Sequence, residues 1–171
     1  MDFTAPVGGG EDHKIAIPLG ILIGLPGSGK STWAGQFVTA HPDYQIVSTD
    51  DIRASLYGDA ASQGDWLQIW AQVLAAWHQG VAAILQGDLA GILYDATNTR
   101  RRHRREAILA ARRLGFTHIT FYWFDVSLST ALERNRLRSR QVPGAVIERM
   151  HRQLQAAPPS LAEGVDQVVR R

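Results

Sequence analysis

Gly24-Leu25-Pro26-Gly27-Ser28-Gly29-Lys30-Ser31 fits the pattern G-x-x-x-x-G-K-[ST] at every fixed position. The pattern has physical meaning when a strand precedes it and a helix follows it, and residues 19–23 and 31–40 have those characters. Glycines let backbone N–H groups turn inward around a phosphate, and the helix N-terminus adds a positive dipole. The sequence therefore predicts a loop that binds the phosphates of a nucleoside triphosphate.

The loop chemistry assigns a role to each polar position. Lys30 is expected to reach the β- and γ-phosphate oxygens, and the Ser31 hydroxyl to ligate Mg²⁺. The predicted ligands are therefore a nucleoside triphosphate and Mg²⁺, and the predicted nucleotide-binding residues are Gly27, Ser28, Gly29, Lys30, Ser31 and Thr32. The loop alone does not choose between phosphotransferases, motors and switches.

Outward from the loop, short apolar segments alternate with amphipathic ones. The pattern predicts strands over 19–23, 44–47, 89–94, 117–124 and 165–170. It predicts helices over 31–40, 50–56, 65–85, 101–114, 128–139 and 143–155. This alternation is typical of an α/β fold with a mostly parallel five-stranded sheet and helices on both faces. Ligands in such folds bind beyond the carboxyl ends of the strands.

Length and composition fit one ordinary globular domain of 171 residues, 45% of them hydrophobic. Cysteine is absent, which excludes disulfides, thiolate-bound metals and a thiol nucleophile. The apolar run over 15–25 is interrupted and too short to span a bilayer, and the acidic N-terminal region is unlike a signal peptide. We expect a cytoplasmic protein without a membrane partner, in which residues 1–14 form a flexible tail before a domain over 15–171.

The charges divide unevenly along the chain. Residues 1–99 carry three Lys or Arg and ten Asp or Glu, whereas residues 100–171 carry fifteen Arg and six Asp or Glu. Arginine suits bidentate contact with phosphate. The C-terminal half is therefore expected to face an anionic partner.

A carboxylate and a cation follow the second predicted strand. A kinase needs a carboxylate to take the proton of the acceptor hydroxyl and a cation to hold the acceptor. Asp50 and Arg53 are three positions apart and would share one face of a helix. The alternative is structural, because Thr49 or Asp50 could simply cap that helix.

Asp95 stands at the end of the third predicted strand. An aspartate in this position of P-loop proteins often holds Mg²⁺ or a water bound to it. Asn98 or Thr99, just beyond, could cap the next helix. The sequence predicts a site role for Asp95 on the metal or acceptor side.

Four arginines alternate through a predicted helix. Arg134 and Arg138 would share one face, and Arg136 and Arg140 the opposite one. One pair could clamp the γ-phosphate while the other faces solvent. The alternative is an ordinary solvated face.

Two further patterns each leave two interpretations open. The basic run over 100–105 could contact nucleic-acid phosphates or form a solvated helix face. Trp66, Trp70 and Trp77 recur at helical spacing, which favours a role in the core over base stacking. The six histidines show no metal-ligand spacing.

Over residues 19–155 the chain resembles the P-loop kinase family that includes the kinase domain of bacteriophage polynucleotide kinase, also grouped with AAA-type ATP-binding proteins. Residues 26–34 (PGSGKSTWA) extend the match past the generic loop, and 50–53 (DDIR) fit the family's D-D-x-R. Residues 95–98 (DATN) resemble its D-T-N with one insertion. Further matches follow in order at 124–126, 133–135 and 142–150.

The resemblance implies a P-loop kinase fold and transfer of the γ-phosphoryl group of ATP to the 5′-hydroxyl of a nucleic acid or nucleotide. It implies that Asp50 is the general base, that Arg53 binds the acceptor phosphate and that Asp95 serves the acceptor or the metal. Lys30 and Ser31 would serve ATP and Mg²⁺. A helical lid over 128–141 would bring Arg134 and Arg138 to the donor phosphates, with Arg138 contributing to catalysis.

Residues 54–90 do not match the phage enzyme visibly, and that stretch would shape the acceptor pocket. Two alternatives therefore stay open. One is a kinase for a small metabolite or nucleoside, and the other is an ATP-binding regulatory module without transfer chemistry.

Overall fold

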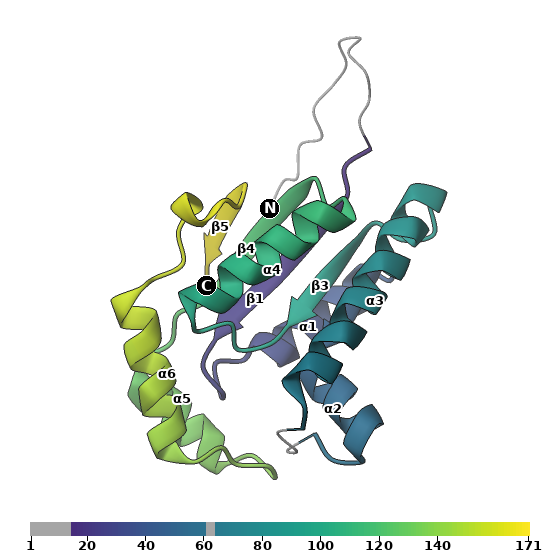
Figure 1. Cartoon of the computed structure of the whole chain (residues 1–171). Coiled ribbons are helices and arrows are strands. Elements are labelled where there is room, and N and C mark those ends of the chain that lie inside the picture. Colours follow the sequence, from purple (N-terminus) through teal and green to yellow (C-terminus); the bar gives the residue numbers. More distant parts are fainter. Residues whose placement is uncertain (1–14, 61–63) are drawn as a thin grey trace.

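The computed structural model describes residues 15–60 and 64–171. The predicted flexible tail over 1–14 lies outside the described residues. Five strands form one sheet in the order β2-β3-β1-β4-β5, and every neighbouring pair runs parallel. The predicted five-stranded α/β fold is confirmed, and the sheet is parallel throughout (Figure 1).

The strands are β1 (Pro18–Gly24), β2 (Tyr44–Ser48), β3 (Gly91–Asp95), β4 (His118–Phe124) and β5 (Gln167–Arg170). The helices are α1 (Lys30–Ala40), α2 (Thr49–Tyr57), α3 (Trp66–Gln86), α4 (Arg101–Leu114), α5 (Leu128–Arg136) and α6 (Gly144–Ala156). A short 3₁₀ helix, η1 (Leu161–Glu163), precedes β5 and was not expected.

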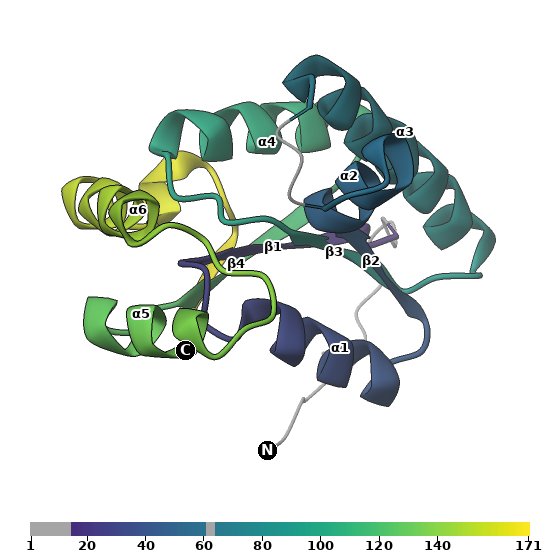
Figure 2. The same ribbon diagram turned by 90° about the horizontal axis from the view of Figure 1, so that it is seen from below.

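The central strand β1 is buried on both sides, as a parallel sheet covered by helices requires. Leu19, Ile21 and Ile23 point into the larger of two hydrophobic clusters, and Leu22 points into the smaller one. Figure 2 shows the corresponding layers, with α3 and α4 on one face of the sheet and α1 and α5 on the other.

The larger cluster lies under α3 and α4 and contains the fully buried Trp77 and Phe116. The smaller lies under α1, where Ala34 meets Leu93 and Phe124. Because both faces are packed, the sheet holds the carboxyl ends of its strands in fixed relative positions at one edge of the domain.

Helix α5 is shorter than predicted, since it ends at Arg136 rather than Ser139. The cause is the buried Asn135 side chain. Its amide nitrogen donates to the Val142 carbonyl at 2.8 Å, and its amide oxygen accepts from the Val142 N–H at 3.0 Å. This pair of hydrogen bonds folds residues 137–141 back as a loop, so Arg138 and Arg140 are not helical.

Among the helices of residues 15–60 and 64–171, none has both the length and the apolar character needed to cross a bilayer.

Candidate active site

A cavity of about 1290 Å³ opens at the carboxyl ends of β1, β2 and β3. Its walls come from the loop after β1, the start of α2, the turn after β3, the segment over 134–142, and facing parts of α3, α4 and α6. Among the predicted site residues, the cavity is lined by Gly27, Gly29, Lys30, Ser31, Thr32, Asp50, Arg53, Asp95, Arg134 and Arg138. The structure thus brings every predicted site residue except Ser28 to the lining of one cavity.

The phosphate-binding loop has the backbone shape that its glycines permit. Gly27 and Gly29 have φ angles of +82° and +93°, a region that other residues rarely adopt. A Cβ atom on Gly27 would also lie 2.5 Å from the Ala131 carbonyl oxygen of α5. Helix α5 therefore rests directly on the loop, and glycine at position 27 allows that approach.

The ammonium of Lys30 lies inside this loop. The residue is 9% exposed, and its Nζ donates to the Leu25 carbonyl at 3.3 Å. Burial lowers the pKa of Lys30 below its ordinary value of 10.5, Asp95 opposes this shift, and Arg138 reinforces it. A cation that is incompletely compensated by protein groups is suited to pair with the oxygens of a bound polyphosphate.

The loop also contains a buried hydroxyl group, that of Ser28. The Ser28 hydroxyl is buried and has no hydrogen-bond partner within the described part of the chain. Buried hydroxyls are normally hydrogen-bonded. Because Ser28 does not line the cavity, the fit to a phosphate group is carried by the turn at Gly27 and Gly29, whose positive φ angles shape the loop.

Ser31 and Asp95 supply the oxygen donors that Mg²⁺ prefers. Burial raises the pKa of the Asp95 carboxyl, while the charge of Lys30 and a hydrogen bond from the Ser31 side chain oppose that shift. Across the described residues, three or more His, Cys, Asp or Glu side chains do not gather into a metal site. The pair therefore fits a Mg²⁺ ion that takes its other ligands from nucleotide phosphates and water, as Mg²⁺ commonly does.

Asp50 does not cap its own helix. The N-cap of α2 is Ser48, whose hydroxyl accepts from the Asp51 N–H at 3.3 Å, which contradicts the alternative that Thr49 or Asp50 caps this helix. The Asp50 carboxylate is paired with two guanidinium groups, with Arg53 at 3.0 Å and with Arg140 at 3.3 Å. The predicted shared face of Asp50 and Arg53 is confirmed.

The turn after β3 is fixed by backbone and side-chain hydrogen bonds. Gly24 N–H donates to the Thr97 carbonyl at 3.0 Å, and the Asn98 amide donates to the Leu22 carbonyl at 2.8 Å. Thr99 donates to Gln153 of α6 at 2.8 Å. The alternative that Asn98 or Thr99 caps α4 is contradicted, because the N-cap of α4 is Arg100. These bonds hold Asp95 beside the phosphate-binding loop.

The two arginine pairs expected on opposite helix faces do not form. Because α5 ends early, Arg134, Arg138 and Arg140 all line the cavity, and Arg136 is exposed outside it. The pairing of Arg140 with Asp50 was not predicted. The spacing of the four arginines predicted a cationic segment correctly. Their relative positions were predicted incorrectly, because the helix was expected to continue past Arg136.

The basic run over 100–105 divides into different roles. Arg100 and His103 line the cavity, and Arg102 pairs with Glu106 at 2.8 Å on the exposed side of α4. Arg104, in contrast, is 0% exposed and pairs with the equally buried Glu163 side chain at 2.7 Å. Neither interpretation of the run fits Arg104, whose charge is part of the core.

All guanidinium nitrogens of Arg104 have acceptors. Besides Glu163, they reach the backbone carbonyls of Asn98, Thr99 and Ala157 at 3.3, 3.1 and 2.8 Å. This one side chain therefore joins the turn after β3 to the end of α6 and to η1.

Arg104→Ala should lower the free energy of unfolding by about 3–5 kcal/mol, because it leaves the Glu163 carboxylate buried without a partner. Urea denaturation followed by circular dichroism measures the change. Arg105→Ala is the matched control, since Arg105 is exposed on the same helix and its loss should change stability little. Equal losses in the two variants would contradict a structural role for the buried pair.

The tryptophan stripe on α3 is only partly core. Trp77 is fully buried and Trp70 packs against the core, as predicted. Trp66 is 42% exposed and lines the cavity, which corrects the core assignment for this residue. It lies in the first turn of α3, beyond the part of the stripe that the sheet covers.

The comparisons with known proteins agree with the geometry. A family model described as "AAA domain" matches residues 19–157. A chain of the solved Pnkp1/Rnl/Hen1 RNA repair complex is 26% identical with a TM-score of 0.68, over 85% of this chain and 46% of that one. This chain thus spans less than half the length of the RNA repair complex chains that it matches.

Two more distant structures share the fold. A fungal RNA kinase is 16% identical with a TM-score of 0.62, over 91% of this chain and 38% of that one. A gluconokinase from Sinorhizobium meliloti 1021 is 19% identical with a TM-score of 0.55, over 92% and 83%. The fold is that of P-loop kinases, and the match over residues 19–157 shows that the chain belongs to the family described as AAA domain.

Proposed function

We propose that this chain transfers the γ-phosphoryl group of ATP to a hydroxyl group, and that the acceptor is the 5′-hydroxyl of a nucleic acid. One observation carries the proposal: the phosphate-binding loop, the Asp50 carboxylate and the arginines of the 134–140 segment all line one cavity. A regulatory module that only binds ATP would not need a carboxylate and a second set of cations opposite the loop.

The donor end would hold ATP through Lys30 and the backbone of the loop, with Arg134 and Arg138 across the phosphates. Ser31 and Asp95 would hold Mg²⁺, which neutralises charge on the β- and γ-phosphate oxygens when bound. These groups act mainly by positioning the triphosphate and compensating its charge.

At the acceptor end, Asp50 would orient the hydroxyl and take its proton. The hydroxyl oxygen forms a bond to the γ-phosphorus, and the bond from that phosphorus to the oxygen bridging to the β-phosphate breaks, releasing ADP. Arg53 and Arg140, which pair with Asp50 in the free protein, are placed to turn to the acceptor and the transferred group.

Three observations support a nucleic-acid acceptor. Arg53, Arg100 and Arg149 line the cavity and would attract an anionic acceptor. The RNA repair complex chain is similar in sequence as well as in fold. The fungal RNA kinase, which shares the fold, acts on a polynucleotide by its name.

The test is transfer of radiolabelled γ-phosphate from ATP to 5′-hydroxyl oligonucleotides, with nucleosides and gluconate as competing acceptor classes. Labelled oligonucleotide is the expected product. If only a nucleoside or gluconate is labelled, the proposed nucleic-acid acceptor is wrong. If none of the acceptors is labelled, the proposed transfer reaction is wrong.

The salt dependence of kcat/KM should distinguish a nucleic-acid acceptor from a neutral small-molecule acceptor, independently of the labelling experiment. For two contacted phosphates on a single strand, log kcat/KM should fall against log salt with a slope of about −1.4, because each contact releases counterions. A neutral acceptor should show almost no slope beyond that of ATP. The measurement is kcat/KM for oligonucleotide and nucleoside between low and moderate KCl, and equal slopes would argue against phosphate contacts.

A further inference from the structure

Three aromatic side chains from α3 and α4 line the cavity, of which Trp66 and His103 are exposed and Trp70 is partly buried against the core. The rings of Trp66 and Trp70 lie 6.1 Å apart with planes 16° from parallel, and those of Trp66 and His103 lie 6.3 Å apart at 17°. All three residues line the cavity. Trp66, Trp70 and His103, here the aromatic array, therefore present nearly parallel ring faces from α3 and α4.

Local hydrogen bonds hold this array in place. Asp65 caps α3 by accepting from the Leu67 N–H at 2.9 Å. The Tyr57 hydroxyl accepts from the Asp65 N–H at 3.0 Å and donates to Gln68 at 3.2 Å. Because Tyr57 ends α2, these bonds tie the start of α3, where Trp66 lies, to the helix that carries Asp50.

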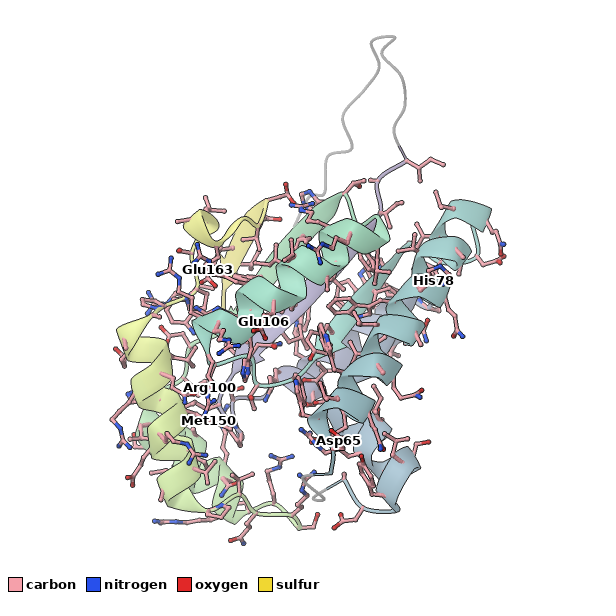
Figure 3. The ribbon with its side chains drawn as sticks, in the orientation of Figure 1. Asp65, His78, Arg100, Glu106, Met150 and Glu163 are labelled. Atoms are coloured by element: carbon pink, nitrogen blue, oxygen red, sulfur yellow. The ribbon has the colours of Figure 1, made fainter. Side chains whose placement is uncertain are left out.

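The array extends along the cavity toward Asp95, at the proposed site of phosphoryl transfer. Trp70 lies 6.4 Å from Tyr94, the residue before Asp95 in β3, measured between ring centroids. The cavity of about 1290 Å³ exceeds the roughly 300–1,000 Å³ of ordinary ligand pockets, which leaves room for an acceptor beside a nucleotide. Figure 3 labels Asp65, just before α3, and Arg100, just before α4; of the two, Arg100 lines the cavity.

The chemistry of this wall suits a flat, uncharged group. Beside the rings, Leu67 is 75% exposed and also lines the cavity. Burial lowers the pKa of His103 from its ordinary value of 6.5, and Arg100 acts in the same direction while Glu106 opposes it, so the neutral imidazole is favoured. A sugar acid would require several hydrogen-bond partners here, whereas a nucleobase requires only ring faces.

We propose that the base of the 5′-terminal acceptor nucleotide stacks on Trp66 and His103, with the phosphate on its 3′ side near Arg100. The inference rests on the proposed function and specifies its acceptor. The array makes the protein select acceptors that carry a terminal base, because every base has a π-face that can stack on indole and imidazole.

The test compares two 5′-hydroxyl oligonucleotides that differ only in having a base or an abasic residue at the first position. Trp66→Ala should raise KM for the base-bearing oligonucleotide roughly tenfold, the scale of one lost stacking contact, and should change KM for the abasic one little. Trp66→Phe should restore most of the affinity. His103→Ala should behave like Trp66→Ala, with His78→Ala as its matched control, since His78 lies exposed on α3 away from the cavity (Figure 3).

Equilibrium binding of the same oligonucleotides separates this inference from the reaction itself. Normal phosphorylation with equal effects of Trp66→Ala on both oligonucleotides would overturn the stacking and leave the reaction standing. Base-dependent binding that Trp66→Ala removes, without any phosphorylation, would support the stacking and overturn the reaction. Neither binding nor transfer by the wild-type protein would overturn both.

Discussion

Lys30→Met should lower kcat about 10²–10³-fold, the usual effect of removing one preorganised donor that stabilises developing charge. Methionine keeps the apolar stem of Lys30 in its buried position and removes only the ammonium. The protein should stay folded by circular dichroism, because the lost hydrogen bond to the Leu25 carbonyl is a single contact within the loop. Steady-state kinetics with ATP and the oligonucleotide acceptor measure the change.

The lowered pKa of Lys30 gives the same variant a second readout. ATP binding favours the charged ammonium, so affinity is constant while Lys30 is protonated in the free protein and falls as the pH rises through its lowered pKa. The fall should therefore begin below pH 10.5, the ordinary value. Lys30→Met should lack this alkaline component when ATP affinity is titrated by calorimetry. Identical pH profiles in the two proteins would show that Lys30 does not contact the phosphates.

Asp50→Asn should lower kcat about 10²–10⁴-fold, the range for loss of a positioned general base. Asparagine can still accept hydrogen bonds from Arg53 and Arg140 but cannot take the acceptor proton. ATP affinity should stay within a few fold, since the donor phosphates are held by other residues. Single-turnover transfer to the oligonucleotide separates the chemical step from product release.

Asp43→Asn is the control for this experiment, because Asp43 is an exposed aspartate outside the cavity. Its kinetics should match those of the wild-type protein. Unchanged turnover in Asp50→Asn would remove Asp50 from the mechanism, while nucleotide binding by the loop would still stand.

Local signals predicted most of the fold. The loop over 24–31 is specified by residues adjacent in sequence, and the strands were visible as apolar runs of the correct length. The all-parallel order follows from their alternation with helices. These features depend on residues that are close in sequence. Most predicted ends of helices and strands therefore lie within a few residues of the observed ends.

Other features depend on partners that sequence spacing does not identify. Arg104 looked like one of several surface arginines, and its burial is decided by Glu163, 59 positions away. Arg140 was assigned to a helix because nothing local shows that Asn135 binds the Val142 backbone. Trp66 followed the helical stripe but lies beyond the end of the sheet that would have covered it.

The buried Arg104 and Glu163 pair also bears on how the domain is made. During synthesis, α4 emerges from the ribosome about sixty residues before η1. Until then the Arg104 guanidinium lacks the carboxylate that pairs with it in the folded domain, and we expect it to stay hydrated and to keep α4 from packing fully on the sheet. We therefore expect the nascent domain to become resistant to proteases only after η1 has been synthesised.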